Sequence, residues 1–322
     1  MDRRFINELS DGEIIEQVFR VSEKQLRTNR NGNLYLQMRL NDRTGSLTAM
    51  LWNAKQHHVD SFDNGDYVKV LGTAQLFNGA MQVLCKEIQA EFSETVDAAD
   101  FEARSLKQIE TMVSDVAEIL SGLKNSHLRD LADCFLLDEQ FMQSFRAAPA
   151  GVKHHHAWQG GLLEHVLSLM KLISTVADHY PGIDREVLVM GAFLHDIGKI
   201  RELTYQPDFG YSDEGQLLGH LVLGVEMLNT KIAETERQSG EPFPIELANH
   251  LKHLILSHHG EYEFGSPKLP MTVEAIVLHL LDNLDSKVAS FQQLIEDDPN
   301  KSSKWTVFYP AINRKLYKAS GT

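Results

Sequence analysis

The sequence predicts a multi-domain α+β protein in which a five-stranded β-barrel is followed by an all-α helical bundle. Two observations support this class. Between residues 13 and 90, apolar residues alternate with polar ones, which is the period of half-buried strands. From Leu106 onward, apolar residues recur at the spacing of amphipathic helices. The change of period indicates two separate domains.

The barrel segment has its strands separated by turn signals. Strands are expected at residues 14–21, 34–40, 47–52, 67–77 and 81–88. In the second strand, Leu36 and Met38 alternate with Tyr35 and Gln37, and Asn78-Gly79 between the last two strands is typical of a hairpin turn. The polar stretch between the third and fourth strands could hold one helix. This order matches the small Greek-key barrel called the OB-fold.

The domain boundaries follow from the same patterns. We expect residues 1–92 to form an OB-type nucleic-acid-binding domain and residues 106–322 to form the all-α domain, with its core at 150–290. The segment 93–105 between them is acidic and weakly apolar, so we interpret it as a linker.

Composition narrows the class of protein. The net charge of −14 argues against a protein that coats nucleic acid nonspecifically. No apolar run approaches the roughly 20 residues of a membrane helix, and the first residues lack the apolar core of a signal peptide. The only cysteines, Cys85 and Cys134, form no CxxC pair. We therefore expect a protein of the reducing cytoplasm without membrane contact.

Histidine and aspartate recur in five places across the second domain, four of them at expected helix ends and the last within a helix. They lie in Gly160-Gly161-Leu162-Leu163-Glu164-His165, Leu194-His195-Asp196-Ile197-Gly198-Lys199, Gly219-His220, Ser257-His258-His259-Gly260 and Leu281-Asp282-Asn283-Leu284-Asp285. Imidazole and carboxylate together suit divalent ions such as Mn²⁺, Fe²⁺, Co²⁺, Ni²⁺ and Zn²⁺. The pattern therefore favours a metal centre.

This order of motifs resembles the HD superfamily of metal-dependent phosphohydrolases, named for its His-Asp doublet. The resemblance covers roughly residues 150–290 and implies that His165, His195, Asp196 and Asp282 bind one metal ion. Superfamily members with two further histidines bind a second ion. The matching positions here are His220 and His258, with His259 as a substitute or an addition.

Two ions close together would activate a water for attack on phosphorus. Lys199 lies about one turn beyond His195, where its ammonium could neutralise a phosphate oxygen, so we take Asp196 and Lys199 as catalytic candidates. Simpler roles exist for single residues. A lone His165 would more often be a core residue, Lys199 could be a solvated helix-end charge, and Asp285 could be a supporting or surface carboxylate.

Substrate contacts are expected at two places. In the histidine run before residue 160, His156 is a candidate substrate contact, although a polar loop is the simpler interpretation. In the barrel, Tyr35, Arg39, Trp52 and Phe77 are candidates for stacking on bases and contacting the backbone of a single strand. The alternative is that Trp52 and Phe77 are barrel core and the arginines a solvated rim. The residues from 305 to 318 also mix aromatic and basic side chains, and for them we favour a helix docked on the second domain over a further strand-binding surface.

An OB-type domain followed by an HD domain resembles the YhaM family of bacterial 3′–5′ exoribonucleases, over nearly the whole chain. The resemblance implies hydrolysis of single-stranded RNA, and to some extent DNA, to nucleoside monophosphates with Mn²⁺ or a similar ion. A homo-oligomer is a further assembly that the sequence leaves open. The alternatives are an HD-type nucleotide phosphohydrolase, which would need no strand-binding barrel, and a noncatalytic RNA-binding regulator with a structural metal.

Overall fold

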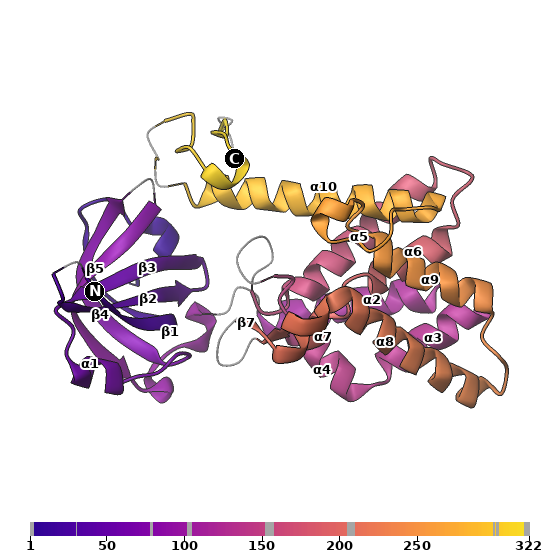
Figure 1. Cartoon of the computed structure of the whole chain (residues 1–322), viewed down its shortest axis with the longest axis horizontal. Helices are drawn as coiled ribbons and strands as arrows, with labels where there is room; N and C mark the ends of the chain where they lie inside the picture. The colour runs from indigo at the N-terminus through magenta and orange to yellow at the C-terminus, as the bar shows by residue number, and fades with distance from the viewer. Residues whose placement is uncertain are drawn as a thin grey trace. The chain divides into compact units, whose positions relative to one another are not determined.

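A computed structural model describes residues 3–29, 31–77, 80–101, 105–151, 158–204, 210–298, 300 and 303–318. Contacts along the chain divide it into two compact units (Figure 1). The first comprises Met1–Ala103, Gln206–Asp208 and Phe291–Thr322, and the second comprises Arg104–Tyr205 and Phe209–Ser290. The division thus groups the last segment with the barrel, whereas the sequence pattern had placed that segment in the helical domain.

The first unit contains the expected closed barrel. Its elements are β1 (Ile14–Thr28), β2 (Leu34–Asp42), β3 (Gly45–Trp52), α1 (Gln56–Asp60), β4 (Tyr67–Phe77) and β5 (Ala80–Glu91). The strands close in the order β1-β2-β3-β5-β4, with β3 and β5 parallel and the other pairs antiparallel. Leu36, Met38 and Leu40 of β2 are buried in the barrel core, as their alternation predicted.

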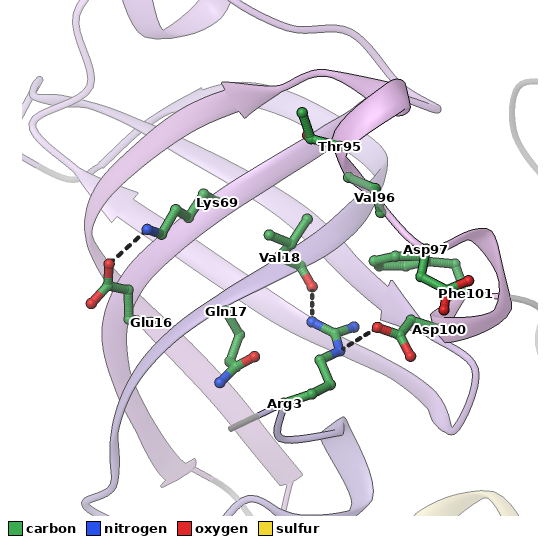
Figure 2. Close-up of a pocket in the computed structure, with 10 residues that line it drawn as sticks. All are labelled: Arg3, Glu16, Gln17, Val18, Lys69, Thr95, Val96, Asp97, Asp100 and Phe101. Carbon is green, nitrogen blue, oxygen red and sulfur yellow. Dashed lines mark hydrogen bonds and ion pairs between the residues drawn. The ribbon is translucent and has the colours of Figure 1, made fainter. Parts of the chain in front are cut away.

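The residues on either side of the barrel strands pack against the barrel itself. Arg3 donates a hydrogen bond of 2.5 Å to the carbonyl oxygen of Val18 and pairs with Asp100 at 3.3 Å. Figure 2 shows both contacts. These residues line a pocket of about 320 Å³. The backbone N–H of Arg43 also donates to Asp100, and Phe101 packs edge-on against Tyr67 at 4.8 Å. The part of the expected linker that follows β5, up to residue 101, is therefore attached to the barrel.

The second unit is helical. It contains α2 (Leu106–Ser121), α3 (Ser126–Leu136), α4 (Glu139–Ala147), α5 (Gly161–Ala177), α6 (Arg185–Leu194), α7 (Lys199–Glu202), α8 (Asp213–Ser239), α9 (Ile245–Ser257) and most of α10 (Val273–Glu296), with two short strands, β6 (Leu203–Thr204) and β7 (Gly210–Tyr211). Every residue of α6 from Val187 to Leu194 is buried, so this helix lies in the core. The pair of two-residue strands is a minor departure from the predicted all-α bundle.

The end of the chain differs from the expectation. A docked helix was expected between residues 305 and 318, but the segment forms two extended stretches that pair Trp305 with Tyr317 and Tyr309 with Arg314. A 3₁₀ turn (Pro310–Ile312) connects them, and Asn313 follows it in the left-handed conformation. The expectation of a helix was therefore wrong.

No helix in the described parts of the chain is long and apolar enough to cross a membrane.

Candidate functional site

The histidine and aspartate motifs converge in the helical unit. His165 lies in the second turn of α5, His195 and Asp196 follow α6, and Asp282 lies within α10. The remaining three histidines lie where helices are interrupted or end. His220 follows a kink at Gly219 in α8, and His258 and His259 follow the end of α9. The structure thus brings together the full set His165, His195, Asp196, His220, His258, His259 and Asp282.

Three of these residues form a first cluster. The Nε2 atom of His165 lies 3.3 Å from Nε2 of His195 and 3.1 Å from Oδ1 of Asp282. One ligand atom from each of the three lies within 4.8 Å of the others. Two imidazoles and a carboxylate at this separation can hold one divalent cation.

The other histidines form a second cluster. The Nε2 atoms of His220 and His259 are 3.2 Å apart, and His258 offers a ligand atom within 4.8 Å of both. His259 is therefore close enough to act in addition to His258 rather than in its place. Imidazole ligands suit several ions, among them Zn²⁺, Fe²⁺ and Ni²⁺, so this cluster does not identify the ion.

Asp196 lies between the two clusters. Its Oδ2 atom is 3.3 Å from Nε2 of His195, while its Oδ1 atom is 3.5 Å from Nε2 of both His220 and His258. The carboxylate is buried, and Oδ1 accepts no hydrogen bond from the described residues. A buried carboxylate oxygen without a donor is costly unless a cation meets it. The donor set therefore fits divalent metal ions.

Each histidine is oriented through its other ring nitrogen. The Nδ1 atom of His165 lies 2.8 Å from Asp285, whose second oxygen accepts from Ser168 at 2.5 Å. The Nδ1 atom of His220 lies 3.1 Å from Glu202. The remaining three Nδ1 atoms are 2.8 to 2.9 Å from the carbonyl oxygens of Ala192, Ile255 and Phe264. Such partners fix the tautomer and aim Nε2 at the ion, as in known metal sites.

The local electrostatics favour cation binding. Burial lowers the pKa of His258 to about 4, which keeps this imidazole in its neutral, metal-binding form. Burial also opposes the charged form of His165, but the hydrogen bonds to Asp282 and Asp285 outweigh it and raise the pKa of His165 to about 9. Without a cation, a proton thus balances these carboxylates.

Lys199 contacts the carboxylate at the centre. Its Nζ atom lies 2.6 Å from Oδ2 of Asp196. Burial favours the protonated form of Asp196, but the charges of Lys199 and His195 hold the pKa of Asp196 well below its usual range. The structure therefore places Lys199 in the centre rather than at a solvated helix end.

Gly198, between the doublet and Lys199, allows α7 to approach α8. A Cβ atom at this position would lie 2.0 Å from the carbonyl oxygen of His220. Only glycine fits this approach without a shift of the backbone. The Gly-Lys pair after the doublet thus has a packing role in addition to any chemical one.

Two supporting residues, Glu202 and Ser168, were not found from the sequence. Glu202 lies at the end of α7, where no spacing rule links it to His220. Its hydrogen bond depends on the packing of α7 against α8, so only the fold reveals it. The other supporting carboxylate, Asp285, was among the residues considered, and its contact with His165 favours the supporting role over the surface one. His156 lies outside the described residues.

The barrel presents aromatic side chains on its outer surface. Trp52 is 45% exposed and Phe77 is 56% exposed, so the alternative that they are barrel core is wrong. Tyr35 pairs with Trp52 across β2 and β3, with ring centroids 4.8 Å apart, and Arg27 is the partner of Tyr35 on β1. Farther along the same face, Arg39 is hydrogen-bonded to Ser46. A base could stack on this pair, of which Trp52 is the exposed member.

Known proteins share both halves of this architecture. Residues 162–287 match the HD domain family, and residues 18–90 match the OB-fold nucleic acid binding domain family. The chain is 34% identical over 309 residues to the 3′-5′ exoribonuclease YhaM of Bacillus velezensis, with 95% of each chain covered. The chain belongs to the YhaM family. The YhaM proteins of Bacillus subtilis and Listeria innocua are 33% and 32% identical to it, with 95% and 92% of each chain covered.

Proposed function

We propose that this chain is a metal-dependent 3′–5′ exoribonuclease that hydrolyses single-stranded RNA to nucleoside monophosphates. The observation that carries the proposal is the buried Asp196 carboxylate between two clusters of histidines, in a chain that belongs to the YhaM family over nearly its whole length. A centre of this composition suits the hydrolysis of phosphodiester bonds.

The centre would hold two divalent ions. His165, His195 and Asp282 would bind one, and the cluster of His220, His258 and His259 the other, with Asp196 contacting both. When bound, the ions would lower the pKa of a water for attack on phosphorus and neutralise charge on the phosphate oxygens. Mn²⁺ is the ion we expect, and Co²⁺, Fe²⁺, Ni²⁺ and Zn²⁺ suit the same donors.

The chain's own residues prepare this centre. Lys199 keeps Asp196 ionised, and a phosphate that enters would attract the same ammonium and be held by it. Glu202 and Asp285 keep His220 and His165 oriented, so little reorganisation is needed when substrate binds.

The barrel would hold the strand. Tyr35 and Trp52 would stack on a base, while Arg39 and Phe77 would contact the strand farther along the same barrel. Stacking and backbone contacts do not select strongly between RNA and DNA, so single-stranded DNA is a second substrate of this proposal.

The barrel also separates this function from the alternatives. A small nucleotide needs no strand-binding surface, which disfavours a nucleotide phosphohydrolase. A regulator with a structural metal would not need the Lys199 ammonium against Asp196. The cytoplasmic location is a prediction that cell fractionation tests. The formation of a homo-oligomer is a second prediction, and light scattering tests it.

The experiment is a digestion of 5′-labelled single-stranded RNA with Mn²⁺, beside EDTA, a panel of free nucleotides, and the Asp196→Asn variant. We expect a ladder that shortens from the 3′ end, lost in EDTA and in the variant, while the variant still binds RNA. An intact oligomer beside a hydrolysed nucleotide would establish the nucleotide phosphohydrolase instead. Turnover of neither would leave the regulator.

A further inference from the structure

The last described segment of the chain has an unusual composition. Residues 303–318, here called the C-terminal hairpin, contain four aromatic residues, four basic residues and no acidic residue, in a chain of net charge −14. The proposed catalytic function uses none of them. Such a composition is typical of surfaces that bind single-stranded nucleic acid.

The backbone of the C-terminal hairpin is ordered by its own hydrogen bonds. The N–H of Thr306 donates to the carbonyl oxygen of Leu316 at 2.9 Å, and the N–H of Lys318 donates to that of Lys304 at 2.8 Å. Nearer the turn, the N–H of Tyr309 donates to the carbonyl of Arg314 at 3.1 Å. The pairing fixes which side chains share a face.

Buried contacts anchor the hairpin to the end of α10. Asp298 is fully buried, pairs with Lys318 at 2.5 Å, and accepts from the backbone N–H of Val307 at 3.0 Å. The hydroxyl of Tyr309 donates to the carbonyl oxygen of Leu294 at 2.9 Å. The hairpin is therefore a folded element with a defined outer surface.

That outer surface carries the large aromatic side chains. Trp305, Phe308 and Tyr317 are 50 to 51% exposed, whereas the smaller Thr306 and Leu316 are buried. The rings of Trp305 and Tyr317 are 5.1 Å apart and inclined by 64°. A hairpin that needed these rings only for its own packing would bury them and expose the smaller residues.

The charges around the rings favour a polyanion. Lys318 is neutralised by Asp298. Lys304, Arg314 and Lys315 are exposed, and none forms an ion pair with another described residue. An apolar protein partner would require no such cations, whereas a nucleic-acid strand supplies both bases for the rings and phosphates for the cations.

We propose that the C-terminal hairpin is a second binding surface for single-stranded RNA, separate from the barrel face of Tyr35 and Trp52. Bases would stack on Trp305 and Tyr317, and Arg314 and Lys315 would contact phosphates. The inference deepens the proposed function because it adds a contact for the same class of substrate. Binding can nevertheless be measured without hydrolysis.

The test is equilibrium binding of the full chain to a fluorescent oligouridine of about 15 nucleotides, in EDTA, followed by anisotropy at several salt concentrations. One variant combines Trp305→Ala with Tyr317→Ala, and a second combines Arg314→Glu with Lys315→Glu. Tyr180→Ala, at a tyrosine that is 54% exposed in the helical unit, is the aromatic control. Lys107→Glu, at an exposed position of α2, is the charge control.

We expect the aromatic variant to bind RNA about 5- to 150-fold more weakly for each stacked base that it loses. The charge variant should lower the slope of log affinity against log salt by about 0.7 for each phosphate that it no longer neutralises. Trp305→Ala alone should also weaken RNA binding. Trp305→Phe should keep most of the affinity that Trp305→Ala loses, because a phenyl ring can also stack. The controls should bind like the unaltered chain.

Unchanged affinity and salt slope in both double variants would overturn the inference, and the charge variant decides the case if the aromatic one does not fold. Unchanged RNA affinity with a lower mass in light scattering would assign the surface to a second copy and also overturn it. Weaker binding by the variants, in a chain that does not degrade RNA with Mn²⁺, would retain the hairpin surface and refute only the proposed function.

Discussion

Replacing Glu202 by glutamine should lower the metal affinity of the cluster that contains His220 and leave the metal affinity of the other cluster unchanged. The carboxylate of Glu202 accepts from the Nδ1 atom and from the backbone N–H of His220, each at 3.1 Å. Its side chain is 11% exposed, so solvent screens this contact little. Glutamine keeps the size and one acceptor, but it removes the negative charge that makes the imidazole a better donor to a cation.

The magnitude follows from comparable supporting carboxylates. Removal of such a partner typically costs 10- to 100-fold in metal affinity or activity, or about 1.4 to 2.7 kcal/mol. Because the amide oxygen of glutamine can still accept from His220, we expect the lower end, about tenfold. The matched variant is Asp285→Asn, which makes the same change beside His165 in the first cluster.

The assay is calorimetric titration of the metal-free chain with Mn²⁺, together with the Mn²⁺ concentration that gives half-maximal RNA hydrolysis. In each variant we expect one binding step to weaken while the other keeps its affinity, and the weakened step should differ between the two variants. Equal weakening of both steps, or affinities unchanged in both variants, would refute the assignment of Glu202 and Asp285 to separate clusters.

Three further changes test other parts of the structure. Trp52→Ala should weaken single-strand binding by about 1 to 3 kcal/mol, measured by anisotropy in EDTA, and full affinity would show that the exposed ring does not stack. Gly198→Ala places a Cβ atom 2.0 Å from the carbonyl oxygen of His220, so urea unfolding should show a loss of about 1 to 3 kcal/mol or more, and unaltered stability would contradict the close packing. The hydrogen bond from Lys231 lowers the pKa of Asp138 from its ordinary 3.8, so its stabilisation is complete above that value and lost as the pH falls through the lowered pKa of the folded state. The difference in unfolding free energy between the unaltered chain and Asp138→Asn should therefore shrink on acidification, and a difference independent of pH would exclude this pairing.

The barrel could be predicted from the sequence because its signal is local. Leu36 and Met38 alternate with polar or half-buried neighbours, and strand burial repeats with the same period of two. The exposure of Trp52 could not be decided in this way, because a residue at the end of a strand can point into the barrel or lie beyond its rim. The three-dimensional closure of the strands decides it.

The histidines of the centre were also found from sequence, because their motifs lie at helix ends and follow a known order. Glu202 was missed because its contact with His220 depends on how α7 packs against α8. At the end of the chain, a docked helix was favoured over a strand-binding surface as the explanation for the mixture of aromatic and basic residues around Trp305. Pro310 and Asn313 favour a turn, but the expectation of a helix rested on composition and did not take their positions into account. The turn they form connects two extended stretches into a hairpin.

We propose a two-ion centre in which Asp196 would contact both ions. The most direct measurement is anomalous X-ray diffraction from crystals grown with Mn²⁺. We expect two anomalous peaks, one among His165, His195 and Asp282 and one among the second cluster of histidines, with Asp196 contacting both. A single peak, or peaks away from these residues, would contradict it.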